Sequence, residues 1–128
     1  MSRAPSRVLH APTVAATLPE LWSPRVVAEV DEVFVKVARV KGELVWHSHD
    51  DEDELFLVLK GKLRLEIENE DPVDLEEGEL FVVKKGVRHL PIADEECHLL
   101  LIERKSTRHT GNEVSERTRS LAEQLRPV

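Results

Sequence analysis

Tyrosine is absent from this chain of 128 residues, and aromatic residues are scarce, with three phenylalanines and two tryptophans. Few aromatic rings leave few platforms on which a sugar ring could stack, which disfavours a dedicated carbohydrate binder. The single cysteine, Cys97, cannot form an internal disulfide, so we expect a protein of the reducing cytoplasm. No adjacent base marks Cys97 as a nucleophile, and we expect it to be a small buried hydrophobe.

The chain also has fewer basic than acidic residues and contains no long apolar run. The 18 basic and 25 acidic residues give a net charge of -7 and a pI near 5.4. Nucleic acids and acidic membranes attract concentrated positive patches, so we predict neither as a partner. No apolar run is long enough to span a bilayer, the N-terminus lacks the apolar core of a secretory signal, and no helix-turn-helix pattern is present.

Short β-type segments are what the chain does contain. Residues 62–68 alternate between charged and apolar, which predicts that Leu63, Leu65 and Ile67 face inward. Asp31-Glu32 and Lys41-Gly42 are predicted breaks between strands. The other predicted strands cover residues 26–30, 33–40, 44–49, 55–59, 73–75, 80–83 and 97–103. Many short strands without a helical period between them indicate an all-β antiparallel barrel or sandwich.

The length allows one domain, which we divide into an arm (residues 1–24), a barrel (25–105) and a tail (106–128). The arm is acid-poor and also fits an organellar transit peptide, but a loosely ordered arm is the simpler interpretation. Its apolar Leu18, Leu21 and Trp22 should be buried, along the barrel or along a neighbouring subunit. In the tail, residues 113–125 are compatible with a short helix capped by Asn112.

Two histidines and a nearby carboxylate are the strongest chemical signal. His47 and His49 are two residues apart in a predicted strand, so both imidazoles should project to the same side. A tight loop would return Glu54, on the next strand, to the same point, although Glu52 has the same parity and competes for the role. His89 follows a later strand and turn. Imidazoles with a carboxylate suit Fe, Mn, Co, Ni or Zn as a divalent ion.

The spacings resemble those of the cupin superfamily. The first cupin motif, H-x-H-x(3,4)-E-x(6)-G, is matched by His47, His49, Glu54 and Gly61. The second, G-x(5)-P-x-G-x(2)-H, is matched at its glycines and at His89. Lys84 replaces the proline of the second motif, Ala93 stands where asparagine is frequent, and the opening Gly42 lies one residue closer to His47 than usual. The motifs favour Glu54 over Glu52.

This resemblance implies a jelly-roll, or double-stranded β-helix, with one divalent metal ion at His47, His49, Glu54 and His89. It further implies a metal-dependent enzyme of dioxygenase or isomerase type acting on a small polar molecule, or alternatively a non-catalytic barrel that binds a small ligand. Small cupins of this kind are often likened to mannose-6-phosphate isomerase. No conspicuous phosphate-binding cluster is present beyond Lys84, Lys85 and Arg88.

The remaining histidines carry less information. His98 lies in an apolar strand, where an outward or core position is expected rather than one in the pocket. His10 and His109 lie near the ends of the chain without a spacing signal. The sequence around His109, Thr110-Gly111-Asn112-Glu113, resembles a Thr-Gly tail found in a subgroup of single-domain cupins.

The run Leu55-Phe56-Leu57-Val58-Leu59 is apolar at every position. If Glu54 faces a metal, alternation sends Phe56 and Val58 inward and the three leucines outward. Monomers rarely leave a contiguous apolar stripe in water. The N-terminal arm, another strand layer or a second subunit would cover such a stripe. We predict a homodimer, in which the arm around residues 18–22 can cross to the partner.

Overall fold

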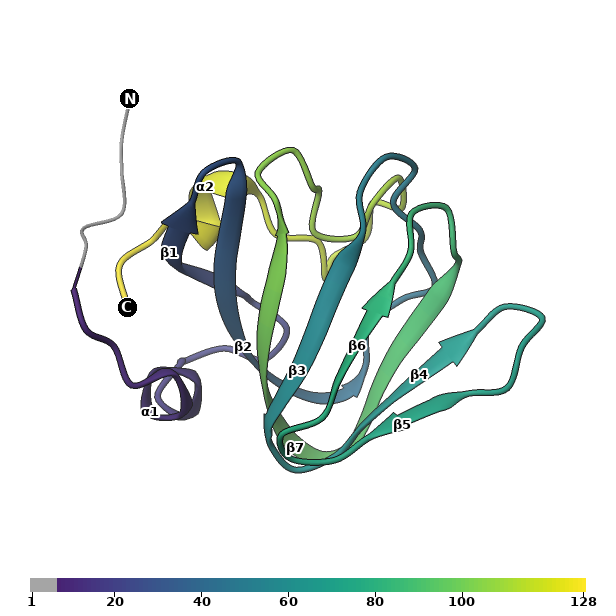
Figure 1. Cartoon of the computed structure of the whole chain (residues 1–128), viewed down its shortest axis with the longest axis horizontal. Helices are drawn as coiled ribbons and strands as arrows, with labels where there is room; N and C mark the ends of the chain where they lie inside the picture. Colours follow the sequence, from purple (N-terminus) through teal and green to yellow (C-terminus); the bar gives the residue numbers. More distant parts are fainter. Residues whose placement is uncertain (1–6) are drawn as a thin grey trace.

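A curled antiparallel sheet makes up most of the structure, a computed structural model that describes residues 7–128 (Figure 1). The strands are β1 (Arg25–Val30), β2 (Val33–Glu43), β3 (Glu54–Lys60), β4 (Leu63–Ile67), β5 (Val73–Leu75), β6 (Leu80–Val83) and β7 (His89–Arg104). Two short helices, α1 (Ala11–Ala16) and α2 (Leu121–Gln124), lie outside the sheet.

Strand β7 is the central strand of the curled sheet, because it pairs with three other strands. Its first residues pair with β4, and its second part pairs with β3, while β2 pairs with residues of β7 from Ile92 to Arg104. The resulting order is β1-β2-β7-β3-β6, with β5 joined to β4. The predicted all-β class and jelly-roll fold are confirmed.

Three predicted boundaries were wrong. Lys41-Gly42 is not a turn, because β2 continues to Glu43 and only shifts register between Val40 and Gly42, as in a β-bulge. Residues 44–49 are not a regular strand, since only His47 forms an isolated bridge, to His89. The last strand begins at His89 rather than Cys97, because the exposed acidic residues 94–96 belong to a continuous β7.

The core lies on the inner face of the curl. Leu63, Leu65 and Ile67 are buried there, as the alternation predicted, and so are Phe56 and Val58 of β3. Cys97 is fully buried in the same cluster, and burial raises the pKa of its thiol to about 12. It is therefore a core residue, as expected from its surroundings in the sequence.

The arm packs on its own barrel. Leu18 and Trp22 are each 4% exposed, and the indole Nε1 of Trp22 donates to the carbonyl of Lys41 at 2.8 Å. Helix α1, with the exposed His10 as its N-cap, packs with Leu18 against β2 and Leu59. Leu21 remains 37% exposed, so its predicted burial was wrong.

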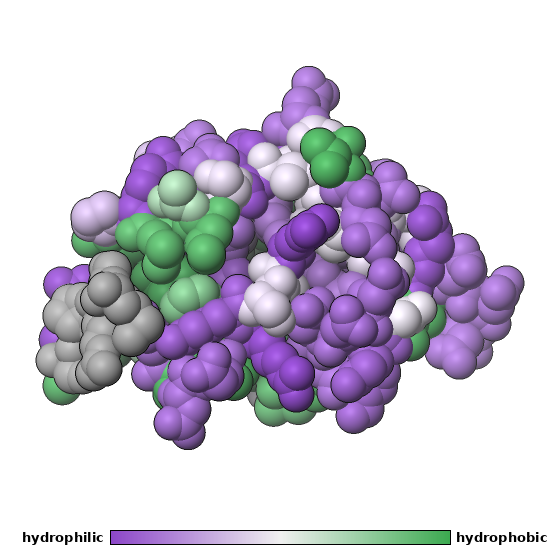
Figure 2. Space-filling view, turned by 90° about the horizontal axis from the view of Figure 1, so that it is seen from above, coloured by the Kyte–Doolittle hydropathy of each residue, from purple (hydrophilic) through white to green (hydrophobic). Residues whose placement is uncertain are grey.

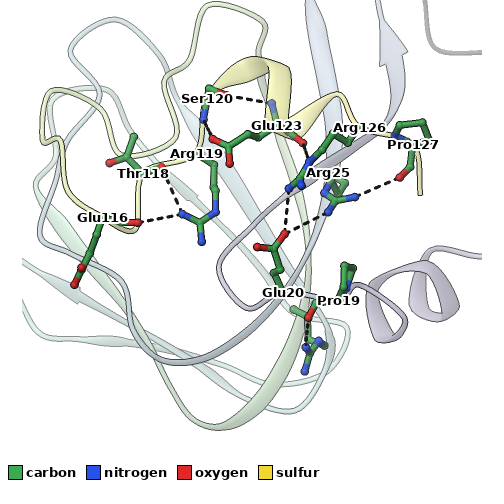
Figure 3. Close-up of polar contacts among 11 residues, drawn as sticks. Pro19, Glu20, Arg25, Glu116, Thr118, Arg119, Ser120, Glu123, Arg126 and Pro127 are labelled. Atoms are coloured by element: carbon green, nitrogen blue, oxygen red, sulfur yellow. Dashed lines mark hydrogen bonds and ion pairs between the residues drawn. The ribbon is translucent and has the colours of Figure 1, made fainter.

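The tail is mostly irregular, and the predicted helix over 113–125 was wrong. Only α2 forms, capped by Ser120, whose backbone N–H and side chain bond reciprocally with Glu123. Figure 3 shows how the end of the chain is tied down: Glu20 of the arm lies between Arg25 and Arg126, at 3.6 and 3.1 Å. The tail thus returns to the side of the sheet where β1 lies.

Seen from above, the molecule is mostly hydrophilic, with apolar side chains gathered on the side that holds β1 and α2 in Figure 1 (Figure 2). Exposed apolar residues of these elements include Val30 and Leu121. Neither helix found in residues 7–128 has the length and apolar character needed to cross a membrane.

Candidate metal site

The isolated bridge between His47 and His89 places two imidazoles side by side. His47 N–H donates to the carbonyl of His89 at 3.0 Å, and His89 N–H returns a bond of 2.9 Å. The ring centroids are 4.4 Å apart. A short stretch of extended chain is thus fixed to the first residue of β7.

His49 and Glu54 complete the group from either end of the acidic loop. The carbonyl of His49 accepts from Gly86 N–H at 2.7 Å, which holds this histidine beside the turn that precedes His89. Glu54 is the first residue of β3 and pairs with Val83 and Glu103. Its side chain follows the inward parity of Phe56 and Val58, so it points toward the histidines.

All four side chains are buried, and one ligand atom from each lies within 4.8 Å of the others. Nε2 of His49, Nε2 of His89 and Oε1 of Glu54 have no hydrogen-bond partner. Buried polar atoms without partners are costly and rare in folded proteins. A divalent cation would satisfy all of them, so the donor set fits a metal site.

The tautomers of two histidines are set by backbone carbonyls. Nδ1 of His47 lies 2.8 Å from the carbonyl of Val45, and Nδ1 of His89 lies 2.9 Å from that of Val87. Each Nδ1–H therefore donates to the backbone, which leaves the Nε2 lone pair free to face the cluster. Burial, followed by the nearby His89, lowers the pKa of His47 from 6.5 to about 4, so the ring is neutral at pH 7.

Glu54 supplies the negative charge. Burial raises the pKa of Glu54, but the neighbouring His49, His89 and Glu103 together lower it further, to well below its usual range. The carboxylate Oε1 lies 3.5 Å from Nε2 of His49 and 3.6 Å from that of His89. These separations are too long for good hydrogen bonds, but they are close to the spacing of ligands around one ion.

A second buried group lies behind Glu54, and sequence reasoning missed it. Lys36 Nζ donates to Glu103 Oε1 at 2.5 Å and to Gln124 Oε1 at 2.6 Å. Burial, and then the charge of Glu54, raise the pKa of Glu103 well above its usual range. The signal was available, because Lys36 shares inward parity with Ala38 and Val40. The group links α2 to the carboxylate of the site.

Other predicted candidates lie elsewhere. Glu52 accepts from the hydroxyl of Ser106 at 2.9 Å and is not part of the cluster. His98 is buried but bonds Glu96 at 2.7 Å, outside the cluster, as expected. Lys84 pairs with Asp53, and Arg88 pairs with Glu68 and Glu113. Neither these two basic residues nor Lys85 lines the cavity next to the cluster.

That cavity has a volume of about 30 Å³ and lies inside the curl of the sheet. His47 and Glu54 form one part of its wall, and most of the remainder is apolar, with Trp22, Val40 and Phe56 among the lining residues. The tail contributes His109, which sequence reasoning had set aside. The Thr-Gly resemblance beside it was the available signal, but no residue pattern connected the tail to the cavity.

Three imidazoles and one carboxylate converge at the inner wall of this jelly-roll barrel. This combination defines a class of β-barrel proteins with a metal-type site inside the barrel. Comparison with known proteins specifies the family. The cupin domain matches residues 34–103, more than half of the chain, and the chain belongs to that family. The match contains all four residues of the cluster.

Individual relatives agree with this assignment. The uncharacterized protein YdbB of Bacillus subtilis is 35% identical over 63 residues, which are 49% of this chain and 56% of that protein. A cupin-2 domain containing protein from Shewanella frigidimarina is 39% identical, with a TM-score of 0.73, over 77% of this chain and 95% of that one. Hydroquinone 1,2-dioxygenase from Sphingomonas sp. TTNP3, with 4-hydroxybenzoate bound, has a TM-score of 0.67 at 20% identity. It covers 72% of this chain and 30% of that enzyme, and its likeness extends to the fold alone.

Proposed function

We propose that this cupin binds one divalent transition-metal ion through His47, His49, Glu54 and His89 and acts as an enzyme on a small molecule held beside the ion. The observation that carries the proposal is the convergence of buried lone pairs that have no partner on the protein. Four protein ligands leave about two positions of an octahedral ion open, which is typical of catalytic rather than structural sites.

The roles of the chain's own residues follow from their contacts. The carbonyls of Val45 and Val87 orient His47 and His89, so that their Nε2 lone pairs face the cluster. Apolar residues, which form most of the remaining cavity wall, would limit the water that reaches the ion. When bound, an ion of this class supplies Lewis acidity toward a carbonyl oxygen and, if it is redox-active, electrons for chemistry with O₂.

Between the two reaction types, the geometry supports an oxygenase better than an isomerase of phosphorylated sugars. The basic residues that a phosphate would need lie outside the cavity, and two of them are already paired with carboxylates. The cavity wall is mainly apolar. A fold shared with hydroquinone 1,2-dioxygenase adds support at the level of the fold.

A non-catalytic barrel that binds a small ligand is the second candidate, and the small cavity favours it. About 30 Å³ holds one or two water-sized groups, so a larger substrate would require the tail or the arm to move.

The cytoplasmic location and the formation of a homodimer stay predictions.

Turnover separates the two candidates. Protein purified anaerobically and loaded with Fe(II) should consume O₂ in an oxygen electrode when small phenols and 2-hydroxy acids are supplied in turn. Consumption should stop in Glu54→Gln and persist in Glu52→Gln. Tight binding of a test compound without consumption or chemical change would favour the binding barrel.

A further inference from the structure

His109 comes from the irregular tail, far in sequence from the metal cluster, yet it lines the same cavity as His47 and Glu54. It is not part of the cluster itself. Among the cavity residues, the indole N–H of Trp22 is already committed to the carbonyl of Lys41. His109 is therefore a polar side chain of this wall that is not a candidate metal ligand and whose ring nitrogen Nε2 is not already hydrogen-bonded to another described residue.

The hydrogen bond at Nδ1 determines what the other ring nitrogen offers. Nδ1 of His109 accepts from the backbone N–H of Arg119 at 2.9 Å, so in the neutral ring the proton is on Nε2. Burial lowers the pKa of His109 to about 4, so the ring is neutral at pH 7. Nε2–H, a donor without a lone pair, has no hydrogen-bond partner among residues 7–128.

The tail holds this donor in a fixed place. Thr110 is fully buried and bonds Thr118 at 2.6 Å, while the side chain of Asn112 donates to Asp50 at 2.9 Å. Gly111 has a φ of 57° and packs so closely on the ligand segment that an added Cβ would overlap the carbonyl oxygen of Ser48. The residues that directly follow His109 are thus anchored beside the cluster, which is the preorganisation that a positioning residue needs.

We propose that His109 is a ligand-positioning residue, whose Nε2–H donates to a lone pair of the small molecule held beside the ion. It would select a ligand that has one hydrogen-bond acceptor on an otherwise apolar body, because the wall is mainly apolar apart from the candidate metal ligands. This inference rests on the proposed metal site and specifies the kind of molecule that the site admits.

Azide binding to the Co(II)-loaded protein tests the role without an assay of turnover. Azide is a small anion with lone pairs at both ends, and its binding changes the visible spectrum of Co(II). His109→Phe removes the donor and keeps a planar ring, so the dissociation constant for azide should rise about tenfold, the effect of one hydrogen bond to a charged acceptor. His109→Gln, which restores an N–H of similar reach, should recover to within about threefold of the wild type.

The Co(II) dissociation constant, measured separately by competition with a chelator, should stay within about threefold in both variants, because His109 is not a ligand. His98→Phe is the matched control, since it replaces a buried histidine outside the cavity, and it should change neither constant. Urea unfolding of each variant should show a folded protein under the assay conditions.

Each other result overturns the inference. Unchanged azide affinity in His109→Phe, or equal weakening in the Phe and Gln variants, would show that the donor does not act on the ligand. A parallel loss of Co(II) affinity would place His109 in the support of the ion instead. If the wild type bound no Co(II), the proposed function would fail together with the inference, whereas Co(II) binding with no effect of His109 would remove the inference alone.

Discussion

At the scale of single residues, the site is explained by lone pairs that the fold buries and does not satisfy. An unpaired buried polar atom costs about 1–3 kcal/mol, and several such atoms converge here. The backbone fixes the tautomers of His47 and His89, so Nε2 of each ring is an acceptor, as is the unsatisfied Oε1 of Glu54. Acceptors of this kind need a cation as their partner, which is the physical reason for assigning a metal site.

Glu54 and Glu52 can be separated by charge removal. Glu54→Gln keeps the shape of the side chain but removes the anionic ligand, so the dissociation constant for Co(II) should rise at least about tenfold. Glu52→Gln is the matched control, because Glu52 is engaged with Ser106 and lies outside the cluster. Competition with a chelator measures the Co(II) dissociation constant of each variant. A larger rise of this constant in Glu52→Gln than in Glu54→Gln would assign the carboxylate ligand to Glu52.

The depressed pKa values predict how stability depends on pH. His47 and His109 both have a pKa of about 4 in the folded chain, against 6.5 in the unfolded chain. The unfolded state therefore binds more protons between these values, and the metal-free protein should lose stability as the pH falls from about 6.5 toward 4.

Urea unfolding of the metal-free protein at pH 7, 6 and 5 measures this dependence. His109→Phe should make the slope of unfolding free energy against pH shallower, because one of the two groups no longer titrates. Equal slopes for the wild type and His109→Phe would contradict the buried, neutral state of His109.

At the scale of elements, the strands provide the ligands and the tail closes the site. Alternation identified the inward faces of β3 and β4 correctly, because a half-buried strand must separate its apolar and polar sides. The spacing of the two motifs brought His47, His49, Glu54 and His89 together as predicted. The alternation is encoded locally, within a few residues along the chain, whereas the meeting of the two motifs, which lie about 40 residues apart, was implied by the resemblance to cupins.

What could not be predicted depends on contacts between distant segments. The bulge near Gly42 and the continuity of β7 depend on pairing between strands about 50 residues apart in sequence. The sequence of the tail shows no helical or strand periodicity from which its path could be predicted. Its position depends instead on polar contacts with distant residues, such as the one between Asn112 and Asp50. His109 was missed because the Thr-Gly resemblance beside it did not connect the tail to the cavity.

Gly111→Ala tests whether the tail closes the site. The added Cβ would overlap the carbonyl oxygen of Ser48 and lies 3.5 Å from Nδ1 of His49. The variant should lose more than about 2 kcal/mol of unfolding free energy, as expected when a close backbone contact is broken, and should bind Co(II) more weakly. Gly78→Ala is the matched control: Gly78 has a φ of 81° but nothing within 4 Å of the added Cβ, so the loss should be only the backbone strain of about 1–2 kcal/mol. Equal losses of stability in the two variants would contradict the close packing of the tail.

At the scale of the whole molecule, the outer face of β3 connects the fold to assembly. Leu55, Leu57 and Leu59 are half-buried, and the arm covers Leu59, so the chain shields part of its own stripe. Beyond the arm, Leu57 pairs with Leu80 of β6 and Leu55 with Ile102 of β7, and those partners are 58% and 36% exposed. The apolar surface that remains is centred on residues 55 and 57.

We expect this surface to form a two-fold contact, because cyclic dimers are the commonest soluble homo-oligomers. Light scattering at micromolar concentration should give twice the chain mass of 14.6 kDa. Leu57→Glu should return the mass to that of one chain, because it places a charge in the contact. Lys62→Glu, a change at an exposed residue after β3, should leave the dimer intact. A monomeric wild type would show that the chain shields its stripe sufficiently, and a dimer that survives Leu57→Glu would place the interface elsewhere.

The most direct test of the account is the metal content of the protein after loading with Co(II) and removal of free ion by gel filtration. The wild type should retain one ion per chain, and His47→Ala/His49→Ala should retain almost none while still unfolding cooperatively, since the apolar core does not depend on these rings. His10→Ala/His98→Ala, which removes two histidines outside the cluster, should retain one ion. If His47→Ala/His49→Ala retained one ion per chain with unchanged affinity, the site assigned here would be wrong.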